Sequence, residues 1–180
     1  MIVSLAQAES AAEFGGKAAQ LAQALSAGLP VPGGFALSSR FVSRVCAGDD
    51  AARVDLLCAF AELNAAVAVR SSAVGEDSAS ASFAGQHQTV LNVRDPEALL
   101  AAVYEVYSSA RTDAAVGYRR KLGLALEPRM GIVVQTLVAA DSSGVLFTRH
   151  PISGADERVI EAALGAWRGG GGRAGWRGDR

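Results

Sequence analysis

The sequence is short of the residues that build disulfide frameworks and catalytic triads. Its 180 residues include two cysteines, Cys46 and Cys58, and neither forms a CxxC pair or has a histidine nearby in sequence. We therefore expect two reduced cysteines, as in a cytoplasmic protein. His87 and His150 are the only histidines. Neither is assigned a catalytic role, because no serine or cysteine nucleophile partnered with an acid is evident.

An excess of one charge and long apolar runs are also missing. The 17 basic and 18 acidic side chains nearly balance, which gives no electrostatic footprint of a nucleic-acid-binding protein. No apolar run approaches the length of a membrane span. The N-terminal stretch MIVSLAQAESAAEF carries two glutamates where a secretory signal has basic residues. These features predict a cytoplasmic protein without a membrane segment.

Capping residues and β-branched runs predict a mixed α/β (α+β) domain over residues 1–165. The expected helices start at Lys17, after Ser38 or Ser39, after Asp49 or Asp50, at Asp95-Pro96 and at Thr112-Asp113. The expected strands cover residues 67–70, 89–93, 131–138, 144–148 and 158–162. Half of the residues are apolar, so the composition allows a substantial core.

The C-terminal stretch has a different composition. WRGGGGRAGWRGDR, which begins at Trp167, holds six glycines and four arginines among its 14 residues. Such a segment cannot bury enough apolar surface to offset the entropy lost on ordering. We therefore expect residues 166–180 to form a disordered tail, with a nucleic-acid role as the weaker interpretation.

Lys17 follows Gly15-Gly16 at the start of a predicted helix, where phosphate groups often bind. The P-loop pattern GxxxxGK[ST] is not met, because Ala11 replaces its first glycine and Ala18 its final hydroxyl residue. From the residues alone, a solvated lysine near a helix start is therefore the preferred interpretation.

A run of small polar residues separates the predicted strands 67–70 and 89–93. Arg70 ends the first strand, and a firmly held guanidinium suits phosphate oxygens. The following residues 71–82 can close over a polyphosphate as a lid, and Gly85 lets the backbone approach a ligand closely. A surface loop with Arg70 in an ion pair explains the same composition, so the residues leave both interpretations open.

Three segments in one order resemble a known family. They are GGKAAQLAQALSAGLPVPGGFALSS, VAVRSSAVGEDSASASFAGQHQTVLNV and VVQTLVAADSSGVLFTRHPISGADERVIEAALG. Together they are similar to the N-terminal nucleotide-binding domain of the phosphoenolpyruvate synthase and pyruvate phosphate dikinase superfamily, which has an ATP-grasp fold. The resemblance spans residues 14–165. Its SFAGQ segment is closer to the synthases and the rifampicin phosphotransferases than to the pyruvate phosphate dikinases.

The resemblance implies ATP contacts at six positions: phosphates at Lys17, Arg70, Gly85 and Thr89, adenine at Gln135, and the hinge at Leu137. In such enzymes ATP, with Mg²⁺, phosphorylates a histidine on a separate swivelling domain. That domain then carries the phosphoryl group to pyruvate or to a drug hydroxyl. ATP and a chain bearing the phosphohistidine domain are thus the implied partners.

The match stops after Leu164-Gly165. The metal-binding glutamate of the family, its Gln-x-Arg-Pro motif and the histidine domain have no counterpart in this sequence. We therefore expect an ATP-grasp-like domain that is incomplete at its C-terminal end, with no catalytic or metal-binding residue assigned and no turnover by the chain alone. Two alternatives stay open: an inactive nucleotide-binding module or gene remnant, and a fragment of a rifampicin-type antibiotic phosphotransferase.

Overall fold

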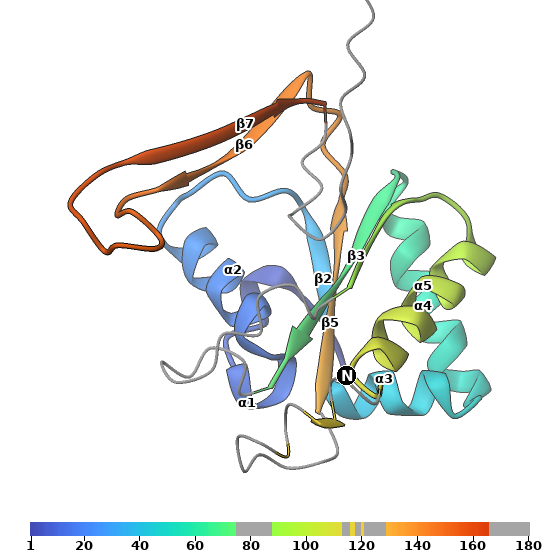
Figure 1. The fold of residues 1–180 in the computed structure, drawn as a ribbon. Coiled ribbons are helices and arrows are strands. Elements are labelled where there is room, and N and C mark those ends of the chain that lie inside the picture. Colours follow the sequence, from blue (N-terminus) through green and yellow to red (C-terminus); the bar gives the residue numbers. More distant parts are fainter. Residues whose placement is uncertain (75–87, 113–115, 118–119, 121–128, 166–180) are drawn as a thin grey trace, which may run out of the picture. The chain divides into compact units, whose positions relative to one another are not determined.

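The computed structural model describes residues 1–74, 88–112, 116–117, 120 and 129–165. The chain divides into two compact units, Met1–Leu137 and Val138–Arg180. The first unit holds most of the helices and strands, and Figure 1 follows them from the N-terminus in blue to the C-terminal strands in red. Each unit is described below by itself.

The first unit is built on a five-stranded sheet in which every neighbouring pair is antiparallel. Across the sheet the strands are β1 (Ile2–Ser4), β2 (Gly34–Leu37), β5 (Met130–Thr136), β3 (Val67–Ala73) and β4 (Thr89–Val93). β5 is central, and its first six residues are all buried. Its run of β-branched residues suits a strand that is covered on both faces.

Helices cover both faces of this sheet (Figure 1). One face carries α1 (Ala11–Phe14) and α2 (Gly16–Ser26), preceded by a short 3₁₀ helix, Leu5–Gln7. The other carries α3 (Ser39–Cys46), α4 (Asp50–Leu63) and α5 (Pro96–Ser109). The larger core lies on the α3–α5 side, and a smaller core of mostly small residues lies under α1 and α2.

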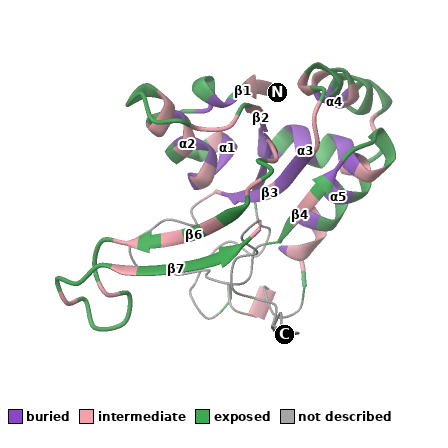
Figure 2. Cartoon of the chain, turned by 90° about the horizontal axis from the view of Figure 1, so that it is seen from above, coloured by how far each residue is buried: buried purple, intermediate pink, exposed green. Residues whose placement is uncertain are grey.

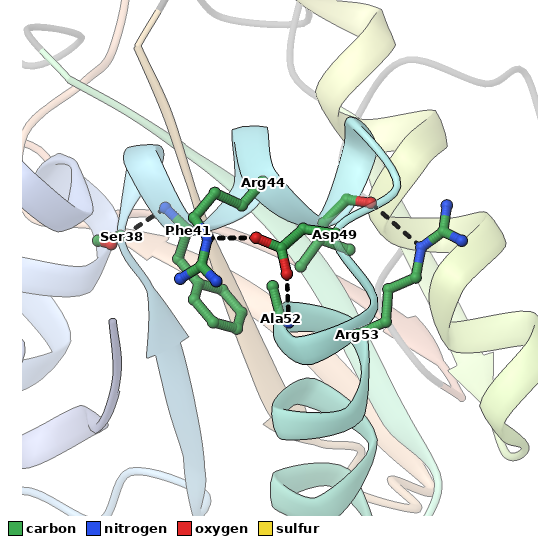
Figure 3. Close-up of polar contacts among 7 residues, drawn as sticks. Ser38, Phe41, Arg44, Asp49, Ala52 and Arg53 are labelled. Atoms are coloured by element: carbon green, nitrogen blue, oxygen red, sulfur yellow. Dashed lines mark hydrogen bonds and ion pairs between the residues drawn. The ribbon is translucent and has the colours of Figure 1, made fainter.

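Side-chain caps fix where the helices of the larger core begin. Ser38 Oγ accepts the Phe41 amide at the start of α3, and Asp49 Oδ1 accepts the Ala52 amide at the start of α4 (Figure 3). Asp49 Oδ2 also pairs with Arg44 Nε at 2.7 Å. The Ser38 and Asp49 caps each satisfy a helix-end amide that has no partner within its own helix, and the Asp49–Arg44 pair joins the end of α3 to the start of α4.

The second unit contains a two-stranded antiparallel sheet, β6 (Ser142–Phe147) and β7 (Val159–Leu164). Leu146 lies opposite Ile160 in the register, and both side chains are largely exposed. Figure 2 shows the contrast in burial: β3 is largely purple, whereas β6 and β7 are mostly green and pink. Within the described residues, no helix is long and apolar enough to span a membrane.

The predicted mixed α/β (α+β) class is confirmed. The helix starts predicted at Lys17, Ser38, Asp49 and Asp95-Pro96 agree with the structure to within one residue. The helix predicted after Thr112 and the tail at 166–180 fall largely or wholly outside the described residues. The assignment of residues 1–165 to one nucleotide-binding domain stays a prediction.

One strand prediction needs correction, and two strands were missed. β3 continues to Ala73 rather than ending at Arg70, so Ser71 and Ser72 belong to the strand and not to a lid. Both serines are buried, and the β3–β5 register extends through them. The short strands β1 and β2 were not predicted, because three or four residues give too brief an alternation to recognise.

Candidate functional site

The face of the sheet that carries α1 and α2 also carries most of the polar side chains singled out from the sequence. Side chains alternate along a strand, so Arg70 and Ser72 project from the same face of β3. The register places Arg70 opposite Val133, and Val133 packs in the small core under α1 and α2. We call this side, with Arg70, Ser72 and Gln135, the α2 face.

Arg70 lies in the middle of β3 and is partly buried. Burial lowers the pKa of its guanidinium from the ordinary arginine value, and no carboxylate in the described part of the chain pairs with it. The alternative of a loop arginine in an ion pair is therefore not supported by the described residues. A partly desolvated cation without an anionic partner is costly, which marks this position as a candidate anion site.

Gln135 orients the guanidinium from the neighbouring strand. Its Oε1 accepts a hydrogen bond from Arg70 Nη1 at 3.2 Å, and its Nε2 donates to the Pro32 carbonyl at 3.1 Å. The Gln135 side chain is buried, with 7% exposed. Both ends of the carboxamide are engaged, so the side chain links the Pro-rich segment before β2 to the arginine.

Lys17 is the second residue of α2 and is partly buried. The helix begins at a close approach between backbones: a Cβ on Gly15 would lie 1.9 Å from the Ser72 carbonyl oxygen. The amide of Ala18, next to Lys17, donates to Ser72 Oγ at 3.1 Å. The Gly15-Gly16-Lys17 segment is thus a tight corner seated on β3, two residues from Arg70.

Thr89 lies opposite Arg70 in the β3–β4 register and is exposed. A bulge displaces the next part of β4, where Asn92 has a φ of 61°. Leu137 follows β5 and donates its amide to the Ala66 carbonyl at 2.8 Å. The boundary between the two compact units falls directly after Leu137.

Gly85 and most of the proposed lid, residues 75–82, lie outside the described residues. The structure thus brings Arg70, Thr89 and Gln135 to adjacent strands and anchors the corner before Lys17 to the same face. Sequence reasoning missed Ser72 as a buried acceptor, because it assigned Ser72 to the lid. Apolar and polar residues do not alternate through Val-Arg-Ser-Ser-Ala, so the pattern of residues 69–73 holds no signal that extends the strand.

The described residues contain no cluster of three or more histidine, cysteine, aspartate or glutamate side chains arranged to hold a metal ion. His150 lies in a turn, where its Nδ1 accepts hydrogen bonds from the amides of Ile152 and Ser153. What the α2 face offers chemically is therefore a cation with hydrogen-bond donors, which suits an anionic ligand.

Comparison with known proteins adds a family match. The sequence pattern of the pyruvate phosphate dikinase AMP/ATP-binding domain matches residues 51–168, which include Arg70, Thr89 and Gln135. An uncharacterized phosphotransferase of Bacillus subtilis, YvkC, is 35% identical over 184 aligned residues. That alignment covers 88% of this chain and 22% of the relative.

Two further relatives match the chain over about half its length. A phosphoenolpyruvate synthase of Aeropyrum pernix is 44% identical over 95 residues, which is 52% of this chain and 12% of the relative. A rifampicin phosphotransferase of Streptomyces sviceus is 49% identical over 90 residues, or 49% of this chain and 10% of the relative. The chain therefore spans between 10% and 22% of the length of these three relatives.

Proposed function

Because this chain belongs to the family of pyruvate phosphate dikinase AMP/ATP-binding domains, we propose that it binds ATP with the phosphates on the α2 face of its sheet. The chain is the nucleotide-binding domain of a phosphotransferase of the phosphoenolpyruvate synthase type. The finer assignment of the fold as ATP-grasp-like is part of the same proposal. An antiparallel sheet with helices on both faces is compatible with it.

Arg70 is the observation that carries the phosphate assignment. Its guanidinium is partly desolvated, held by Gln135, and unpaired with any carboxylate of the described segments. A phosphate oxygen would supply the missing counter-charge, and hydrogen bonds to charged groups contribute about 1.5–3 kcal/mol. A buried charge that is unfavourable without a ligand and becomes favourable when the ligand binds is typical of a binding site rather than of a structural ion pair.

The other predicted contacts follow from this placement. We assign Lys17 and Thr89 to the phosphates, since Thr89 neighbours Arg70 and Lys17 begins the helix anchored to β3. We keep Gly85 as a phosphate-site residue on the family resemblance alone. Gln135 acts first as the holder of Arg70, and a contact with adenine near Leu137 is the additional role that the family resemblance implies.

The described residues do not form a metal site by themselves, so no step through Mg²⁺ is assigned to this chain. Phosphoryl transfer depends mainly on positioning and on neutralising charge, and the α2 face contributes to both through Arg70 and Lys17. We propose that the acceptor is a histidine on another domain or chain, which passes the group to pyruvate. The similarity to rifampicin phosphotransferases supports an antibiotic hydroxyl as the second candidate acceptor.

Titration calorimetry with ATP tests the proposal on the full chain. Arg70→Ala should weaken ATP binding by about 10- to 100-fold, the equivalent of one charge-assisted contact. Arg94→Ala is the matched control, because Arg94 is exposed at the end of β4 and bonds only to Asn92 Oδ1 among the described residues. Equal affinities for wild type and Arg70→Ala would refute the phosphate assignment.

A further inference from the structure

Ser72 is a fully buried polar residue that belongs to none of the predicted ATP contacts. It lies on β3 two residues after Arg70, and its Oγ accepts the amide of Ala18 at 3.1 Å from 54 residues away in sequence. Ala18 is the third residue of α2. Amides in the first turn of a helix have no partner within that helix, so they need an acceptor from elsewhere.

The usual acceptor is the side chain of the residue that precedes the helix, and here that residue is Gly15. A serine could not replace it, since a Cβ at Gly15 would meet the Ser72 carbonyl oxygen at 1.9 Å, and the φ of Gly15 is 87°. Ser72 therefore supplies, from the sheet, the capping oxygen that the helix cannot carry itself. The helix start and the strand are joined by this one hydroxyl at a point of direct backbone contact.

A second close approach fixes the same corner from the other side. A Cβ on Gly131 of β5 would lie 2.1 Å from the Phe14 carbonyl oxygen and 3.0 Å from the Ser72 carbonyl oxygen. The last residue of α1 thus sits on β5 just as Gly15 sits on β3. The corner before α2 is close-packed against β3 and β5. The first turn of α2 can therefore move only by rotating or shifting, and the hydrogen bond to Ser72 Oγ opposes this movement.

We propose that Ser72 is a positioning residue for nucleotide binding: its hydroxyl fixes the first turn of α2, and Lys17 with it, relative to Arg70. The inference rests on the proposed function, because it requires that Lys17 and Arg70 bind the same phosphate group. Lys17 immediately precedes the amide that Ser72 holds, and Arg70 lies two residues before Ser72 on the same face. The hydrogen bond from the Ala18 amide to Ser72 Oγ thus links the helix that carries Lys17 to the strand that carries Arg70.

A purely structural cap would also destabilise the protein when removed, so stability alone does not test the proposal. Ser38 provides the matched control. It is 2% exposed, its Oγ accepts the Phe41 amide at the start of α3, and α3 packs on the opposite face of the sheet. Ser72→Ala and Ser38→Ala each remove a buried serine cap, and Ser38→Ala also removes the hydrogen bond that Ser38 Oγ accepts from the N-terminal ammonium at 2.9 Å. Only Ser72→Ala removes the cap of the helix that carries Lys17.

The experiment is a double-mutant cycle on ATP affinity, measured by calorimetry on the full chain. Ser72→Ala should weaken ATP binding by about 5-fold when Lys17 is present and should have no further effect when Lys17→Met is already made, since coupled residues are not additive. Ser38→Ala should leave the affinity unchanged in both backgrounds. An unchanged affinity in Ser72→Ala, or a loss that is the same with and without Lys17, would overturn the inference.

Two further measurements keep the result decisive. If Ser72→Ala does not fold, Ser72→Cys retains a weak acceptor and should weaken ATP binding by less than about 5-fold, again only when Lys17 is present. A loss that is the same with and without Lys17 would overturn the inference. If the wild type binds no ATP, the proposed function fails. The anchoring role is then tested by hydrogen exchange: the Ala18 amide should exchange faster in Ser72→Ala than in Ser38→Ala, and equal rates would overturn it.

Discussion

The corner at Gly15 provides the most quantitative test of how this fold places its helix. Gly15 has a φ of 87° and a ψ of 168°, a backbone region that essentially only glycine adopts, and a non-glycine residue there costs about 1–3 kcal/mol. The added Cβ would also lie 1.9 Å from the Ser72 carbonyl oxygen, so backbone must move. Overpacking of this kind costs about 1–3 kcal/mol more. We therefore expect Gly15→Ala to lower the free energy of unfolding by about 2–6 kcal/mol.

Gly28→Ala separates the two contributions. Gly28 also has a positive φ, 75°, but no atom lies within 4 Å of a Cβ built there. Gly28→Ala should lower the free energy of unfolding by the backbone cost alone, about 1–2 kcal/mol. For a chain of this size each kcal/mol shifts the melting temperature by about 2–4 °C, so circular dichroism can resolve the difference. If the melting temperature of Gly15→Ala is no lower than that of Gly28→Ala, the close approach of the α2 start to β3 is contradicted.

Two further predictions concern titrating groups on the α3–α4 side of the first unit. Burial raises the pKa of the Cys46 thiol to about 11, so iodoacetamide at pH 8 should modify the exposed Cys58 first, as followed by mass spectrometry. Equal labelling of both thiols in the native protein would contradict this. The hydrogen bonds from Arg44 and the Ala52 amide hold the pKa of the Asp49 carboxyl below its ordinary value. Their contribution is therefore present above the unfolded-state pKa of about 3.9 and is lost as the pH falls through the lower native value. Urea unfolding should show the deficit of Asp49→Ala relative to wild type shrinking as the pH is lowered below about 4, and a deficit that stays constant down to about pH 2 would contradict this.

The helix starts were predictable because they depend on capping hydrogen bonds between residues that are close in sequence. Asp49 and Asp95 accept amides three residues onward, and that pattern can be recognised without knowing the rest of the fold. The central strand β5 was predictable from its β-branched run for a similar reason. The predicted bounds, residues 131–138, were displaced by one or two residues from Met130–Thr136.

The α2 face was only partly predictable. Arg70 and Lys17 could be singled out from their neighbours in sequence, yet their relation depends on Ser72 and Gly15, which are brought together by long-range pairing. Serine has little preference for strands, so the extension of β3 beyond Arg70 depends on its register with β5. The contacts of Gln135 with Arg70 and Pro32 likewise join segments more than 60 residues apart.

The central claim is that ATP phosphates bind on the α2 face beside Arg70. Backbone amide NMR of the isotopically labelled chain during an ATP titration tests it most directly, because it locates the ligand as well as detecting it. We predict that amides of Arg70, Gln135 and the first turn of α2 shift on ATP addition, and that Arg70→Ala needs about 10- to 100-fold more ATP to reach the corresponding shifts of Gln135 and α2. Shifts confined to α4 and α5, or an unchanged titration midpoint in Arg70→Ala, would contradict the account.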